Sequence, residues 1–310
     1  MRVVFFGSDD FAATCLKELK TVRVVGCVTR PDSRQGRGMK LALSPIKNIA
    51  LEHDMVCLQP FSLKEESTVQ QLKSLQADIF VVVAYGKILT QAVLEIPKMF
   101  CVNVHGSLLP KYRGAAPVNW AILHGEKETG VTIQKMALAL DAGDIITQQS
   151  MTIGPQETSI QLRDRMAQVG SKFLVRTLND IDSGNYRLTP QQESQATDAP
   201  KLTKEMGKID WGRPAGQIYN QIRGLQPWPG AFTSYKGKML KILEASPDAS
   251  VGAGPGSIVD ISKEGFIIAC GQGGLLVKSV HLEAGKVMSA HDFLQGYRLT
   301  LGEGLYASIT

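Results

Sequence analysis

Several features that are diagnostic of other protein classes are missing from this sequence of 310 residues. Its five cysteines are scattered, and none of them forms a C-x-x-C pair or a spacing typical of zinc ligands. No apolar run approaches the length of a transmembrane helix. Nothing like a secretory signal precedes the first expected strand, at residues 2–7. We therefore expect a cytoplasmic protein with reduced thiols, no membrane span and no bound metal.

The common nucleotide-binding motifs are also missing. The first expected strand is followed by a single glycine, Gly7, and the only G-x-G within residues 1–189, at residues 36–38, lies in a polar loop without a third glycine. No P-loop pattern occurs. These absences argue against a nicotinamide-dependent oxidoreductase, although the order of the expected strands and helices suits a nucleotide-binding type of fold.

The first part of the chain has the alternating sequence pattern of an α/β domain. Apolar runs alternate with amphipathic stretches, and near-continuous runs such as IFVVVA at residues 79–84 are typical of parallel strands that are covered on both faces. This order predicts a doubly wound, Rossmann-type sheet. The amphipathic stretch at residues 159–178 is expected to form a helix that closes the domain.

The second part of the chain has a different pattern. Apolar residues almost vanish between residues 182 and 199, and short apolar runs separated by Gly-rich and Pro-rich turns follow. Several short strands at this spacing predict a small barrel or sandwich, of which an OB-like β-barrel is one kind. We therefore expect an N-terminal α/β domain at 1–189, a linker at 190–206 and an OB-like domain at 207–310.

The stretch NVHGSLLPKYRGAAP at residues 103–117 follows an apolar run and indicates a functional strand end. Side chains alternate along a strand, so Asn103 and His105 leave the same face near the strand's carboxyl end, where open α/β sheets place ligands. Asp141 follows a later strand. An amide, an imidazole and a carboxylate suit acyl transfer to an amine. Spacing alone does not bring the three together, and a strand-end histidine bonded to a nearby carbonyl remains an open interpretation.

Several short motifs, which occur in a fixed order along nearly the whole chain, match the motifs of a known family. They are GSDDFA at 7–12, GRGMKLALSPIK at 36–47, DIFVVVAYGKIL at 78–89, NVHGSLLPKYRGAAP at 103–117, ETGVTIQKM at 128–136, LDAGDI at 140–145, KIDW at 208–211 and PWPGAF at 227–232. The chain resembles the folate-dependent formyltransferases, in particular those whose acceptor is methionyl-tRNA, and it departs from their first motif at Asp9. The resemblance implies a formyltransferase domain followed by an OB-like domain. It also implies transfer of a formyl group from 10-formyltetrahydrofolate to the methionine of initiator methionyl-tRNA. We expect the protein to be a monomer.

The resemblance also assigns residues to the site. It implies that Asn103, His105 and Asp141 are catalytic and that Asp144 is structural. Cys101 is interpreted as structural for a different reason, because a cysteine in an apolar strand is commonly a small buried hydrophobe. Leu108 and Leu109 have an alternative interpretation as ordinary core residues, since loop leucines often cover a core. The residues that the resemblance assigns to the folate are Ser107, Leu108, Leu109 and Pro110 in the loop, with Tyr85, Gly86, Ile88 and Leu89 near the pterin.

The acceptor is indicated by a basic stretch at residues 30–47. Formyltransferases that act on an amino-sugar nucleotide have close counterparts of NVHGSLLPKYRGAAP and PWPGAF, so these motifs do not identify the acceptor. The basic stretch is what separates the alternatives. It resembles the loop that meets the acceptor stem of tRNA, and its basic side chains suit a phosphate backbone, although a solvated loop remains an alternative. A non-catalytic RNA-binding protein is a further alternative, which the intact catalytic residues oppose. The residues expected to bind tRNA are Arg37, Arg34, Lys40 and Lys47.

Overall fold

The computed structural model describes residues 1–35, 40–249 and 254–305, and the chain divides into two compact units. The boundary near residue 200 falls within the segment that the sequence predicts to be a linker. The first unit comprises Met1–Pro117, Glu128–Thr152 and Arg163–Pro200, and the second comprises Val118–Lys127, Ile153–Leu162 and Lys201–Thr310.

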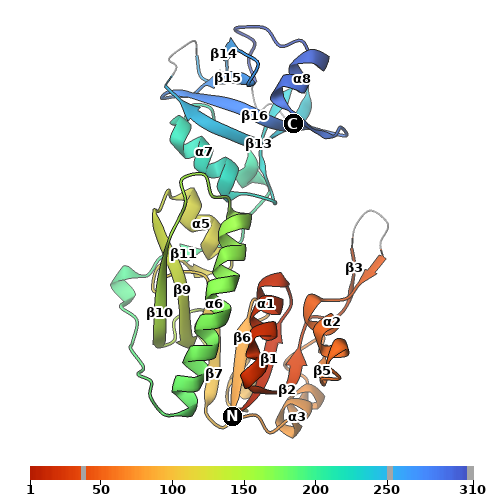
Figure 1. Cartoon of the computed structure of the whole chain (residues 1–310), viewed down its shortest axis with the longest axis vertical. Coiled ribbons are helices and arrows are strands. Elements are labelled where there is room, and N and C mark those ends of the chain that lie inside the picture. The colour runs from red at the N-terminus through yellow and green to blue at the C-terminus, as the bar shows by residue number, and fades with distance from the viewer. Residues whose placement is uncertain (36–39, 250–253, 306–310) are drawn as a thin grey trace. The chain divides into compact units, whose positions relative to one another are not determined.

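The first unit is built on a seven-stranded sheet in the order β10-β9-β7-β6-β1-β2-β5 (Figure 1). The five strands from β7 to β5 in this order are parallel, and β9 and β10 are antiparallel additions at one edge. This arrangement confirms the predicted Rossmann-type α/β domain. The strands are β1 (Arg2–Gly7), β2 (Arg23–Val28), β5 (Cys57–Leu58), β6 (Ile79–Val83), β7 (Phe100–His105), β9 (Glu128–Lys135) and β10 (Ile145–Thr152).

Helices cover the parallel strands because both faces of these strands are apolar. On one face, Val4 and Phe6 of β1 share a core with Val69 and Leu72 of α3 and with Val93 of α4. Their alternation along β1 is the period of two expected for a strand. The helices that contribute residues to this unit are α1 (Asp10–Glu18), α2 (Pro45–Glu52), α3 (Glu66–Ser74), α4 (Gln91–Leu94) and α6 (Ser159–Asp182).

The departure from the family motif at Asp9 has a clear structural role. Asp9 is the N-cap of α1, and its carboxylate accepts a hydrogen bond from the backbone N–H of Ala12. The same carboxylate forms an ion pair with Arg163 of α6. An aspartate at this position therefore satisfies an otherwise unpaired donor at the start of the helix.

The second unit is an antiparallel β domain, which confirms the predicted fold class. Its main sheet has the order β12-β13-β16-β15-β14, and β17 pairs with β16. Trp211, Ile218, Phe266 and Phe293 lie in its core. The elements that contribute to it are α5 (Pro117–Leu123), α7 (Ala215–Gly224), β12 (Ala231–Tyr235), β13 (Lys238–Asp248), β14 (Ile258–Ile261), β15 (Phe266–Ala269), β16 (Gly274–Leu282), β17 (Val287–Ser289) and α8 (Ala290–Gly296).

Within residues 1–35, 40–249 and 254–305, no helix combines the length and the apolar character needed to cross a bilayer.

Candidate active site

Polar side chains gather at the carboxyl end of β7, where the sheet changes from parallel to antiparallel pairing. β7 pairs with β6 on one side and with β9 on the other. In the register with β9, Asn103 lies opposite Gln134, and His105 lies opposite Thr132. Directly opposed residues of an antiparallel pair present their side chains on the same face. The change of direction therefore places a second amide, that of Gln134, beside Asn103.

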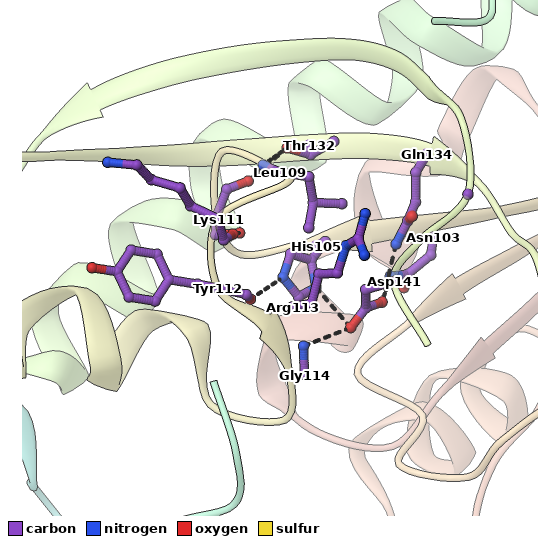
Figure 2. A network of polar contacts seen from close by, with 12 residues as sticks. Asn103, His105, Leu109, Lys111, Tyr112, Arg113, Gly114, Thr132, Gln134 and Asp141 are labelled. Atoms are coloured by element: carbon purple, nitrogen blue, oxygen red, sulfur yellow. Dashed lines mark hydrogen bonds and ion pairs between the residues drawn. The ribbon is translucent and has the colours of Figure 1, made fainter. Parts of the chain in front are cut away.

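Asp141 completes this group from the turn that follows β9 (Figure 2). Its Oδ1 accepts hydrogen bonds from Asn103 Nδ2 at 3.3 Å and from Gln134 Nε2 at 3.0 Å. Its Oδ2 accepts from the backbone N–H of Gly114 at 2.9 Å and lies 3.6 Å from His105 Nδ1. The three residues predicted to be catalytic thus lie together, and their role in catalysis stays a prediction.

His105 is held from both sides of its ring. Its side chain is 5% exposed, its Nδ1 faces Asp141, and its Nε2 lies 2.8 Å from the carbonyl oxygen of Tyr112. A neutral imidazole has one N–H and donates to only one of these oxygens, whereas an imidazolium donates to both. The alternative interpretation, a strand-end histidine bonded to a nearby carbonyl, therefore describes one of the two contacts of this ring.

The turn that carries Asp141 is tightly packed at Gly143. A Cβ atom at Gly143 would lie 1.8 Å from the carbonyl oxygen of Lys135, so no side chain fits without a shift of the backbone. We expect G143A to lower the free energy of unfolding by about 1–3 kcal/mol, the usual range for overpacking. Denaturant unfolding measures this, with G216A as the control, because a Cβ atom at Gly216 of α7 would meet nothing within 4 Å. Equal stabilities of G143A and the wild type would contradict the prediction.

The loop predicted to hold the folate is fixed to β9 and β10. The backbone N–H of Leu109 donates to Thr132 Oγ1, whose hydroxyl donates to the carbonyl of Ser107. Gln148 Nε2 donates to the carbonyl of Leu109 at 2.8 Å. Ser107 and Leu109 are buried, whereas Leu108 and Pro110 are half-buried. Leu109 is thus packed as the core interpretation expects, and the half-buried pair retains surface for a ligand.

The second set of predicted folate residues lies just after β6, and it includes both buried and exposed residues. Tyr85 and Leu89 belong to the core of the first unit, so their contact with a ligand would involve main-chain atoms. Ile88 is 74% exposed, and Gly86, at φ +77°, lies beside the guanidinium of Arg30. An exposed apolar side chain next to accessible backbone suits a flat heterocycle.

Tyr85 carries a buried polar atom without a partner. Within the described residues, its hydroxyl makes no hydrogen bond, and burial raises its pKa to about 12. A buried donor of this kind is costly unless a partner is supplied.

The residues predicted to bind tRNA are only partly described. Arg37 lies outside the described residues. Arg34 and Lys40 belong to β3 (Ser33–Gln35) and β4 (Lys40–Ala42), which pair as an antiparallel hairpin. Lys47 forms an ion pair with Asp32, and the hydrogen bond from Lys47 lowers the pKa of that carboxyl. Lys47 is therefore already engaged by an acid of the same stretch.

Cys101 is unsuited to act as a nucleophile. It is buried two residues before Asn103, and burial raises the pKa of its thiol to about 12. The reactive thiolate is then absent at neutral pH. Among the described residues, no group of three His, Cys, Asp or Glu side chains could hold a metal ion.

Three partners of Asp141 were not predicted from the sequence: Gln134, Gly114 and Gln191. Strand alternation assigns Gln134 to one face of β9, but only the register of β7 and β9 shows that this face lies beside Asn103. Gln191 donates to the backbone carbonyl of Asp141 at 2.8 Å. No local signal marks Gln191, since it lies in a polar segment without periodicity.

Comparison with known families covers both units. Residues 1–178 match the family described as "Formyl transferase", and residues 201–298 match "Formyl transferase, C-terminal domain". A methionyl-tRNA formyltransferase from Moorella thermoacetica is 45% identical over 306 residues, which cover 98% of each chain. A methionyl-tRNA formyltransferase from Caldanaerobacter subterraneus is 44% identical over 305 residues, which cover 97% of this chain and 99% of that one.

Solved structures with lower identity share the fold. The sugar 3N-formyl transferase WlaRD has a TM-score of 0.68 at 18% identity, with coverage of 92% of this chain and 99% of that one. HypX from Aquifex aeolicus, solved in complex with tetrahydrofolic acid, has a TM-score of 0.65 at 16% identity. The match covers 97% of this chain and 48% of HypX. From the family matches and the near-full-length identities, we conclude that the chain belongs to the formyl transferase family, among the methionyl-tRNA formyltransferases.

Proposed function

We propose that this protein transfers the formyl group of 10-formyltetrahydrofolate to the α-amino group of methionine on initiator methionyl-tRNA. The observation that carries the chemistry is the convergence of Asn103, His105 and Asp141 at the end of β7. The acceptor follows from the identity to methionyl-tRNA formyltransferases over nearly the full length. We further propose that the protein acts in the cytoplasm as a monomer and without a metal.

In the proposed reaction, the methionyl amine attacks the formyl carbon and a new C–N bond forms. The carbonyl oxygen becomes an oxyanion, and the bond to N10 then breaks as N10 takes a proton. Asp141 lies beside the imidazole of His105, where it orients the ring and assists removal of the amine proton. The products are the formylated methionyl-tRNA and tetrahydrofolate.

Two donors of the group are suited to the oxyanion. The amide of Asn103 has two N–H groups, one of which already donates to Asp141. Its other N–H is the one we assign to the oxyanion. For His105, Nδ1 faces Asp141, so Nε2 is the nitrogen that exchanges the Tyr112 carbonyl for the oxyanion. Preorganised donors of this kind are commonly worth a factor of about 100 to 1,000 in rate.

A panel of acceptors tests the proposed function. The protein is incubated with 10-formyltetrahydrofolate and, separately, with methionyl-tRNA, uncharged tRNA, glycinamide ribonucleotide or an amino-sugar nucleotide. We expect a formylated product with methionyl-tRNA alone. Product with the amino-sugar nucleotide instead would support the alternative acceptor, and binding of tRNA without any product would support a non-catalytic RNA-binding protein.

The basic stretch at residues 30–47 gives a separate prediction about the acceptor. We expect R37A to raise the KM for methionyl-tRNA by about 10- to 100-fold, which corresponds to the loss of one hydrogen bond to a charged group. The dependence of tRNA binding on salt should become shallower by about one unit of slope, because one phosphate contact is lost. Folate binding should not change. Steady-state kinetics at several salt concentrations measure both effects.

A matched arginine provides the control for this prediction. Arg23 is exposed at the amino end of β2, whereas the candidate site lies at the carboxyl end of the parallel strand β7, and we expect R23A to behave like the wild type. Equal weakening of folate and tRNA by R37A would indicate a folding defect or a folate contact and would count against a tRNA contact.

A further inference from the structure

A segment that the sequence predicts to be a linker lies against the turn that carries Asp141. We name residues 189–199 the brace segment. At its start, Thr189 forms an antiparallel bridge with Ile145. At its end, β11 (Asp198–Ala199) pairs in parallel with β8 (Arg113–Gly114). The brace segment is therefore attached to the first unit on both sides of the candidate site.

Gln191 connects the brace segment to the backbone of the Asp141 turn. Its Nε2 donates to the carbonyl of Asp141 at 2.8 Å and to the carbonyl of Gly143 at 2.7 Å. Its Oε1 accepts from Nε and Nη2 of Arg113, at 3.0 and 2.9 Å. Both N–H groups of this amide and its oxygen are thus used. The side chain of Gln191 thus connects the turn that carries Asp141 to Arg113 of β8, the strand that follows His105 in the sequence.

The turn needs such support because of its backbone conformation. Asp141 has φ +50°, in the left-handed region that is unfavourable for residues other than glycine. Strained residues persist only where their surroundings hold them. The two carbonyls bound by Gln191 lie at this residue and two residues after it, so the amide spans the strained position.

The brace segment also fixes the donor that binds the carboxylate of Asp141. The backbone N–H of Gly114 donates to Asp141 Oδ2, and Figure 2 shows this contact beside His105. Gly114 is held by its pairing with Ala199, and a Cβ atom at Gly114 would lie 2.7 Å from the Ala199 carbonyl oxygen. The backbone of Ala115 donates to the same carbonyl at 2.8 Å. Both the backbone and the carboxylate of Asp141 are therefore positioned by the brace segment.

We propose that Gln191 is a positioning residue, which holds Asp141 in the orientation that formyl transfer requires. This inference rests on the proposed function and assigns a task to a residue outside the reacting group. Gln191 donates to two backbone carbonyls and, at 3.4 Å, to Oε1 of Gln134. Within the described set of hydrogen bonds it does not contact His105 or Asn103. Its loss should therefore change the rate of the chemical step more than the binding of either substrate.

The variants Q191E and Q191A test the proposal. Q191E retains an acceptor for Arg113 but removes both donations to the turn, whereas Q191A removes all of these contacts. We expect kcat for formylation of methionyl-tRNA to fall by about 10- to 100-fold in both variants, the effect of a small misplacement of a catalytic group. The KM values for methionyl-tRNA and 10-formyltetrahydrofolate should stay within about twofold of the wild type. Q192A, at the exposed neighbouring position, is the control and should retain full activity.

A second measurement separates positioning from a general folding effect. Hydrogen exchange of the backbone amides at residues 141–144 should become faster in Q191E, while the exchange of β1 and β6 should not change. If Q191A does not fold, Q191E alone decides the result. A Q191E variant with wild-type kcat and wild-type exchange would overturn the inference while the wild type remains active. A wild type that forms no formylated methionyl-tRNA would overturn the proposed function itself, and the inference with it.

Discussion

Replacing Asp141 by asparagine is expected to lower kcat for formyl transfer by about a thousandfold, within the range for loss of a positioned acid–base group. The carboxylate accepts hydrogen bonds from Asn103, Gln134 and the backbone of Gly114. An amide at this position presents an N–H group to one of these donors in either orientation. It also removes the negative charge beside His105 and the acceptor for the amine proton. The side chain keeps its size, so the fold should be preserved.

Steady-state kinetics with both substrates measure the effect of D141N. The KM values should change little, because the carboxylate is assigned to the chemical step. D144N is the matched control, since Asp144 lies in the same turn and is interpreted as structural. A D141N variant that retains more than a tenth of the wild-type kcat would remove the carboxylate from the proposed chemistry.

Replacing His105 by alanine is expected to lower kcat by about 100- to 1,000-fold, the usual cost of losing one donor to an oxyanion. The ring is buried between Asp141 and the Tyr112 carbonyl (Figure 2). Alanine has no group that could donate a hydrogen bond in its place. Folate and methionyl-tRNA should still bind, because the variant retains the strand end and the loop after it.

Rates at saturating substrate and equilibrium binding of the folate together measure the effect of H105A. H53A serves as a matched control, because His53 is exposed at the end of α2, and it should behave like the wild type. Near-normal turnover by H105A would show that the imidazole does not stabilise the transition state.

The fold could be predicted because its signals are local. Near-continuous apolar runs marked the parallel strands, and the polar alternation at Asn103 and His105 marked the functional strand end. The structure confirms the α/β domain followed by the antiparallel β domain. It adds that β9 runs antiparallel to β7, which places Gln134 beside Asn103. That pairing depends on the path of the chain between the strands, which their own residues do not specify.

The supporting contacts of the site could not be predicted because they are tertiary. Gln191 lies in a polar stretch that has the composition of a linker, yet its amide contacts the backbone at Asp141 and Gly143. Composition reports how much apolar surface a segment can bury, and it does not report hydrogen bonds between side chains and distant carbonyls. Tyr85 and Leu89 are a second example. The resemblance assigns both to the folate, yet their side chains lie in the core, a distinction that neither spacing nor resemblance reveals.

The most direct test of the central claim is the rate of the chemical step in a single turnover. Wild type and D141N, each in excess over methionyl-tRNA and saturated with 10-formyltetrahydrofolate, are mixed and quenched, and formylmethionyl-tRNA is measured over time. We expect both proteins to bind both substrates, and D141N to transfer the formyl group at least about 100-fold more slowly. Equal single-turnover rate constants for the two proteins would contradict the assignment of Asp141 to the chemical step and, with it, the proposed catalytic group.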